Sequence, residues 1–76
     1  MWDDEIDATG LLCPLPVLKA RKRLSRMAPG AVLRLSSTDP AAPVDVAHFC
    51  REAGHELVSS HAEDGAQIYL IRRGAE

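Results

Sequence analysis

Residues 13–30 read CPLPVLKARKRLSRMAPG, and this stretch decides the fold. Apolar residues recur in it at spacings of three and four, the period at which side chains share one face of an α-helix; they are Val17, Ala20, Leu24 and Met27. Proline suits a first helical turn, and a Pro-Gly pair ends a helix. The stretch therefore predicts an amphipathic helix that begins near Pro14 and stops before Pro29-Gly30.

Short runs of strand-forming residues flank this helix. Residues 5–8 form a candidate strand that ends in a turn at Gly10, and residues 31–37 alternate so that Leu33 and Leu35 point inward. A strand, a helix and a second strand in this order form a right-handed unit with parallel strands. We therefore expect the two strands to lie side by side, with the helix packed across them.

The second half of the chain predicts another helix and a hairpin. A helix from near Pro43 to just before Gly54 places four apolar residues on one side, namely Val46, Phe49, Cys50 and Ala53. Residues 56–61 and 67–72 then flank the turn Glu63-Asp64-Gly65, as in an antiparallel hairpin. The order β-α-β-α-β-β predicts an α/β fold of the α+β two-layer type, with two helices on one face of a four-stranded mixed sheet.

Length and composition limit the kind of protein. The chain has 76 residues, of which 46% are hydrophobic and 26% charged, so we expect one domain over residues 1–76. A net charge of −2 argues against direct binding of nucleic acid as the main activity. No apolar run is long enough for a membrane span, and the start of the chain is acidic. We expect a cytoplasmic protein whose two cysteines stay reduced.

The candidate reactive residue is Cys13, which lies just before the predicted helix. The first N–H groups of a helix lack partners and carry partial positive charge, so they favour an anion there. Together with the positive field of Lys19, this predicts a lowered thiol pKa and a nucleophilic thiolate. Pro14 and Pro16 stiffen the segment, and Gly10 makes the turn before it. We expect a rigid, exposed sulfur.

Other cysteine chemistries fit the sequence less well. The chain lacks a Cys-x-x-Cys pair that could resolve a mixed disulfide, and its cysteines and histidines are not spaced as paired metal ligands. We therefore expect neither a metal nor another cofactor. Taken by itself, the Cys-Pro-x-Pro motif leaves a structural cysteine as an even alternative to a reactive one.

Residues 7–17, DATGLLCPLPV, resemble the N-terminal signature of the TusA/SirA-like family of sulfur carrier proteins. The resemblance continues through Asp39-Pro40, the Phe49-Cys50 pair and the ending YLIRRG, and so covers nearly the whole chain. It implies the two-layer fold and a persulfide carried on Cys13, received from a cysteine desulfurase or a rhodanese and passed to an acceptor protein. The family's destinations include 2-thiouridine in tRNA, sulfur oxidation and molybdenum cofactor enzymes, and the sequence does not choose among them.

The sequence also predicts roles for several residues outside the Cys13 segment. A partner could dock on the basic residues of the first helix, although a solvated helix face explains them equally well; they are Lys19, Arg21, Lys22, Arg23 and Arg26. Leu15, between the prolines, is expected to touch partners. The helical phase of Cys50 predicts a packing role, and His48 and His61 are expected at the surface. His55 is expected to hydrogen-bond the loose carbonyls that end the second helix.

Two functions of other classes stay open at this point. One is a regulatory module whose basic helix contacts RNA or an acidic protein while the thiol senses oxidants. The other is a standalone sulfurtransferase that turns over an anionic donor such as thiosulfate, bound at the helix N-terminus.

Overall fold

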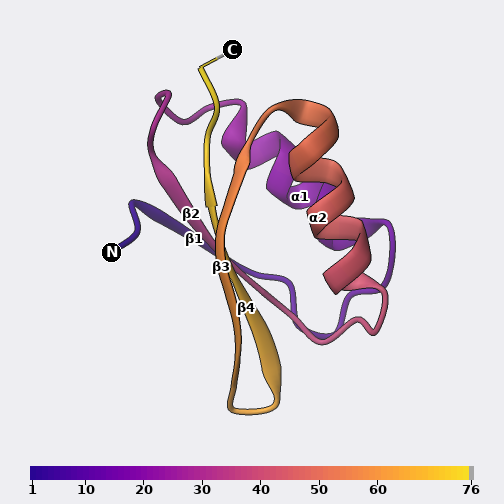
Figure 1. The fold of residues 1–76 in the computed structure, drawn as a ribbon. Coiled ribbons are helices and arrows are strands. Elements are labelled where there is room, and N and C mark those ends of the chain that lie inside the picture. Colours follow the sequence, from indigo (N-terminus) through magenta and orange to yellow (C-terminus); the bar gives the residue numbers. More distant parts are fainter. Residues whose placement is uncertain (76) are drawn as a thin grey trace.

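The computed structural model describes residues 1–75 and has the predicted order of elements. The strands and helices are β1 (Asp4–Asp7), α1 (Leu15–Leu24), β2 (Val32–Ser37), α2 (Ala42–Ala53), β3 (Glu56–Glu63) and β4 (Ala66–Arg72). The sheet has four strands in the order β1-β2-β4-β3, with β1 and β2 parallel and the other pairs antiparallel. Both helices cover the same face of the sheet (Figure 1). The predicted α+β fold is confirmed.

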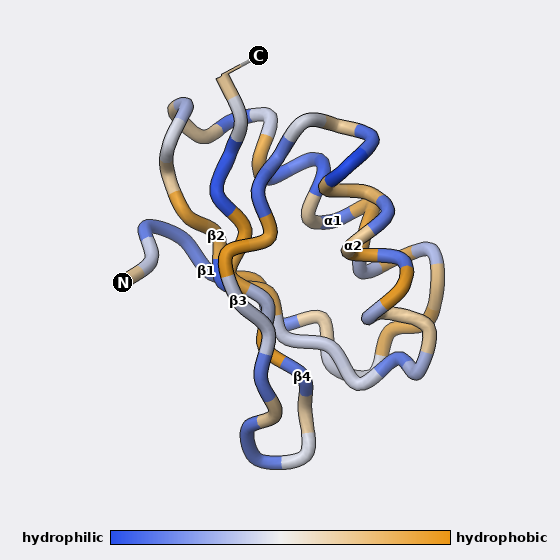
Figure 2. The backbone as a smooth tube through the Cα atoms, in the orientation of Figure 1, coloured by the Kyte–Doolittle hydropathy of each residue, from blue (hydrophilic) through white to orange (hydrophobic). Residues whose placement is uncertain are grey.

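The core lies between the sheet and the two helices. From the sheet it receives Leu33 and Leu35 of β2 and Tyr69 and Ile71 of β4, all of which are fully buried. The helices contribute a second set of buried residues, namely Ala20, Leu24, Val46, Phe49 and Cys50. Figure 2 shows the strands becoming hydrophobic where they pass the helices. Each large apolar side chain buried here stabilises the fold by about 1.5–3 kcal/mol.

The first helix ends earlier than the sequence predicts. It stops at Leu24, because the Ser25 hydroxyl donates a hydrogen bond of 2.7 Å to the carbonyl of Lys22 and competes for an acceptor of the helix. The N–H groups of the next two residues bond three residues back, Arg26 to Arg23 and Met27 to Leu24, both at 3.0 Å. The segment before Pro29 is thus a run of tight turns, although Val17, Ala20, Leu24 and Met27 still face the core.

The second half follows the prediction more closely. Helix α2 ends at Ala53, and Gly54 takes the left-handed conformation, with φ 79°, that commonly closes a helix. The hairpin is longer than predicted, since Glu63 pairs with Ala66 and belongs to β3. The turn is therefore Asp64-Gly65 alone, with positive φ at both residues, as the tightest hairpins require. Its tip extends beyond the helices, which leaves most of β3 exposed (Figure 1).

Parallel pairing of β1 and β2 places the starts of both helices at one edge of the sheet. Each strand is followed by a loop and then by a helix, and the carboxyl ends of parallel strands meet at the same edge. The loops before α1 and before α2 are therefore neighbours. Cys13 lies in the first of these loops, and Asp39 lies in the second.

Candidate functional site

Two hydrogen bonds to the neighbouring loop fix the segment that carries Cys13. The N–H of Gly10 donates to the Thr38 hydroxyl at 2.9 Å, and the N–H of Cys13 itself donates to Oδ2 of Asp39 at 2.9 Å. Gly10 has a φ of 83°, which a glycine adopts without strain, so its predicted turn is present. The backbone of Cys13 is held in place while its side chain is exposed, as expected.

Asp39 joins the starts of the two helices. Its side chain is only 8% exposed, and besides the Cys13 N–H it accepts the N–H of Ala41 through Oδ1 at 3.2 Å. Its carbonyl accepts the N–H of Ala42, the first residue of α2, at 3.0 Å. The sequence indicated only a turn at Asp39-Pro40. Its link to Cys13 was missed, because the pairing of the two loops depends on the sheet register.

The two prolines of the motif have different environments. Pro14 caps the start of α1 and is exposed, and its carbonyl accepts the N–H of Leu18 at 3.1 Å. Pro16 is buried, so it anchors the first turn to the core. The Cys13–Pro14 peptide bond is cis. The motif thus has one proline on the core side and one beside the exposed sulfur.

A groove of about 400 Å³ runs from Cys13 between the two helices. Pro14 and the α1 residues Val17 and Arg21 line one side of it, and α2 lines the other with Asp45, His48, Phe49 and Glu52. The Arg21 guanidinium lies over the ring of Phe49, 5.2 Å from its centroid. The sulfur therefore sits at the head of a groove whose α2 wall carries acidic side chains.

The predicted lowering of the Cys13 pKa is wrong. The pKa is raised, chiefly because the thiol hydrogen-bonds the Asp45 side chain, and also through partial desolvation and the negative charges of Asp45 and Asp39. A hydrogen bond and two nearby carboxylates favour the neutral thiol over the anion. Asp45 lies in the first turn of α2 and meets the sulfur only in the folded chain.

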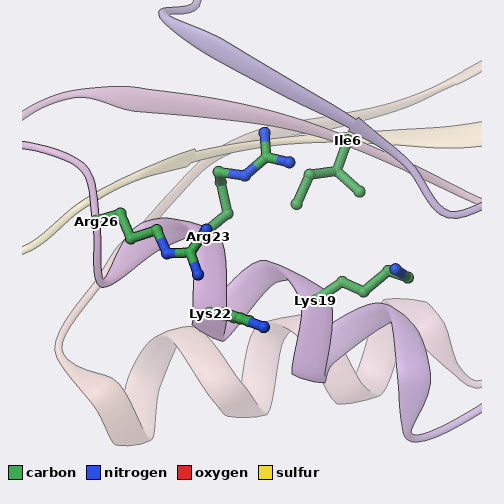
Figure 3. Close-up of a pocket in the computed structure, with 5 residues that line it drawn as sticks. All are labelled: Ile6, Lys19, Lys22, Arg23 and Arg26. Atoms are coloured by element: carbon green, nitrogen blue, oxygen red, sulfur yellow. The ribbon is translucent and has the colours of Figure 1, made fainter.

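The basic residues of α1 divide into two groups. Lys19, Lys22, Arg23 and Arg26, the basic face, gather beside Ile6 of β1 around a hollow of about 220 Å³ (Figure 3). Arg23 is paired there with Asp4 at 2.9 Å. Arg21 points to the opposite side and belongs to the groove that holds Cys13. A docking role for these residues stays a prediction.

The second cysteine lies in the core, as predicted. Cys50 is 3% exposed, and burial raises the pKa of its thiol to about 11. Its carbonyl accepts the N–H of His55 at 2.9 Å. A thiol that is buried and protonated at neutral pH is unreactive while the protein stays folded.

The histidines lie where the sequence predicts. His48 and His61 lie at the surface, as expected. His55 does bond a carbonyl at the end of α2, because its backbone N–H donates to Cys50, and its side-chain Nδ1 accepts the N–H of Gly74 at 2.9 Å. The C-terminal segment was not expected to return to this corner. Within residues 1–75, no three cysteine, histidine or acidic side chains are grouped as a metal site would need.

Fold and site together describe a small α+β protein that presents one exposed thiol at a helix start. Residues 4–73 match the family described as "Sulfurtransferase TusA", and the chain belongs to that family. It is 43% identical over 72 residues to the "Sulfur carrier protein TusA" of Allochromatium vinosum, covering 95% of each chain. It is 42% identical over 74 residues to the protein of that name from Pseudomonas aeruginosa PAO1, covering 97% of this chain and 94% of that one.

A solved structure has the same fold. The SirA-like protein from Desulfitobacterium hafniense superposes with a TM-score of 0.84 at 24% identity, covering 95% of this chain and 99% of that one. At this identity the likeness concerns the fold. No helix in the described part of the chain combines the length and apolar character needed to cross a membrane.

Proposed function

We propose that this protein is a sulfur carrier that holds a sulfane sulfur as a persulfide on Cys13 and transfers it between partner proteins. The observation that carries the proposal is the placement of Cys13, whose backbone is fixed by Asp39 while its side chain stays exposed. A fixed, exposed sulfur can meet the reactive group of a second protein. The relatives named as sulfur carriers support this role.

The transfer exchanges one sulfur–sulfur bond for another. The Cys13 sulfur attacks the terminal sulfur of a donor persulfide, the new bond forms on Cys13, and the donor leaves as a thiolate. The proton lost from Cys13 returns to the donor sulfur, so donor persulfide and carrier thiol become donor thiol and carrier persulfide. The step needs no external oxidant or reductant.

The surface around Cys13 suits contact with a protein. The exposed apolar side chains near it are Leu12, Leu15, Leu18 and Val44. Large apolar side chains exposed near one site are a common feature of protein interaction surfaces. We assign the basic face, Lys19, Lys22, Arg23 and Arg26, a supporting role in docking acidic surfaces, because complementary charge speeds encounter. Cysteine desulfurases and rhodaneses are the donors that this proposal names.

The electrostatics of the site disfavour the two other functions. Thiosulfate is an anion, and the carboxylates of Asp45 and Asp39 beside the sulfur would repel it. Oxidant-sensing cysteines have lowered pKa values, whereas that of Cys13 is raised. A carrier needs no such pre-formed thiolate, because the partner can complete the site.

The proposal places the relay in the cytoplasm, where a reducing environment keeps the Cys13 thiol free for loading. Delivery to 2-thiouridine synthesis in tRNA is one destination compatible with it. Sulfur oxidation and molybdenum cofactor enzymes are others, and they share the loading step.

Intact-protein mass spectrometry tests the loading step. After incubation with a cysteine desulfurase and cysteine, the wild type should gain about 32 Da per sulfur and lose it on reduction. Cys13→Ser should gain nothing, whereas Cys50→Ala should load like the wild type. A rhodanese with thiosulfate serves as the second donor. Sulfur loading on the Cys13→Ser variant, or none on the wild type from either donor, would overturn the proposal.

A further inference from the structure

The groove next to Cys13 carries more negative than positive charge. Asp45 and Glu52 line its α2 wall, and Asp39 lies directly behind the Cys13 backbone. From α1 only Arg21 contributes a positive charge, and its guanidinium is stacked on Phe49. His48 is the remaining titratable group of the lining. The field at the sulfur is therefore set mainly by carboxylates.

Asp45 has no cationic partner within the described structure. The ion pairs formed within residues 1–75 use other acids, namely Asp4, Glu5, Glu56 and Glu63. Asp45 is half-buried in the first turn of α2 and lines the groove together with Cys13, and its carboxylate is the main cause of the raised thiol pKa. Asp39 differs, because two backbone N–H groups already satisfy it. Among the described residues, Asp45 and Glu52 are thus the carboxylates of the groove that a cation can still pair, and Asp45 is the one that acts on the Cys13 thiol.

We propose that Asp45 is the recognition point for a basic side chain of the sulfur donor, which enters the groove, pairs with this carboxylate and releases the Cys13 thiol for reaction. The inference rests on the proposed carrier function and names the chemistry of the partner. In the unloaded protein the Asp45 carboxylate lines the same groove as Cys13 and favours the protonated form of its thiol. A lysine or arginine beside Asp45 removes the negative field and makes loss of the proton easier.

This arrangement couples reactivity to the presence of the correct partner. Small oxidants and electrophiles bring no cation, so the sulfur meets them in its protonated form, which is a poor nucleophile. A donor that presents its persulfide together with a basic side chain both docks and activates the carrier. The acidic groove and the basic face on the other side of α1 would then contact oppositely charged parts of the partner.

The first test measures thiol reactivity without any donor protein. The rate of Cys13 alkylation by iodoacetamide is followed against pH in the wild type, in Asp45→Asn and in the matched control Asp64→Asn. Asp64 is in the hairpin turn, outside the groove, and asparagine tolerates its positive φ. Asp45→Asn should shift the profile to lower pH and raise the rate at pH 7 by roughly three- to tenfold. The control should keep the wild-type profile.

The second test uses the charge of the attacking reagent. Cystamine, a cationic disulfide, should react with the wild type faster than 3,3′-dithiodipropionate, an anionic one. Asp45→Asn should reduce this preference by roughly 16-fold at low ionic strength, because the Coulomb energy of charges about 5 Å apart in water changes each of the two rates by about fourfold, in opposite directions. An unchanged preference, or an equal change in Asp64→Asn, would overturn the role of Asp45.

Loading from a cysteine desulfurase distinguishes two roles of Asp45, namely recognition of the donor and simple suppression of thiol reactivity. If a donor cation pairs with Asp45, Asp45→Asn should load more slowly than the wild type although its thiol reacts faster with iodoacetamide. Faster loading together with faster alkylation would overturn the recognition role. Absence of loading in all variants, with the alkylation and disulfide results as predicted, would instead contradict the carrier function and leave the acidic groove established.

Discussion

The two cysteines occupy opposite situations in the same helical layer. Cys13 lies just before the start of α1, where Asp39 holds its backbone and its side chain is exposed. Cys50 is buried near the end of α2, where the N–H groups of Gly54 and His55 bond its carbonyl and the returning Gly74 bonds the His55 ring. The end of the layer with Cys13 is accessible to a partner. The end with Cys50 is covered, and we call it the sealed end. The two residues are of the same type, so the packing around each one decides which thiol is accessible.

The largest effect expected from this difference is on the alkylation rates of the two cysteines. With iodoacetamide at pH 8, the native protein should take up one label, on Cys13, and Cys50 should react at least about 100-fold more slowly, because its exposure requires an opening that costs several kcal/mol. Both cysteines should react at similar rates in denaturant. Peptide mapping of the labelled protein measures the ratio. Comparable native rates would mean that the α2 end is not sealed.

The next effect is on stability. Cys50→Ser should lower the free energy of unfolding by about 1–3 kcal/mol, because it buries a hydroxyl without a partner. Cys13→Ser lies at an exposed site and should change stability by less than about 0.5 kcal/mol. Urea denaturation measures both. Cys50→Ala has a similar volume but no polar atom, so it should cost less than Cys50→Ser, and the reverse order would contradict a packing role.

Much of the fold follows from local patterns in the sequence. The period of Val17, Ala20, Leu24 and Met27 identified the buried face of α1, and the alternation around Leu33 and Leu35 identified the inner face of β2. Such patterns report burial directly, since each element has one face toward the core. The end of α1 escaped prediction because the Ser25 hydroxyl competes locally for a helix carbonyl.

The electrostatics of the site could not be predicted in the same way. The position of Cys13 before a helix was visible in the sequence, but its raised pKa comes from Asp45 and Asp39, which reach it only through the pairing of two loops. Helical spacing alone separates Arg21 from the basic face, but the position of its guanidinium over the Phe49 ring depends on how the two helices pack. Local sequence identified the cysteine at the start of α1, and tertiary contacts determine the electrostatics around it.

The smallest expected effect concerns His55, at the sealed end. Burial, followed by the positive charges of Arg73 and Arg21, lowers the pKa of His55 below its ordinary value of 6.5. The folded state therefore favours the neutral ring, whose Nδ1 accepts the Gly74 N–H. As pH falls below about 6.5, the unfolded chain binds the proton first, so this contribution to stability is present above 6.5 and is lost as pH falls through the folded pKa.

Urea midpoints at pH 7 and pH 5.5 should therefore show a loss of a fraction of a kcal/mol in the wild type. His55→Asn keeps an acceptor that can face Gly74 but cannot titrate, so its stability should change less between these two pH values. Asp4 and Asp7 do not interfere, because their pKa values are lowered from 3.8 by hydrogen bonds, from the Glu5 N–H for Asp4 and the Thr9 hydroxyl for Asp7, and their effect begins at more acidic pH. An equal loss in both proteins would show that the sealed end does not depend on a neutral His55.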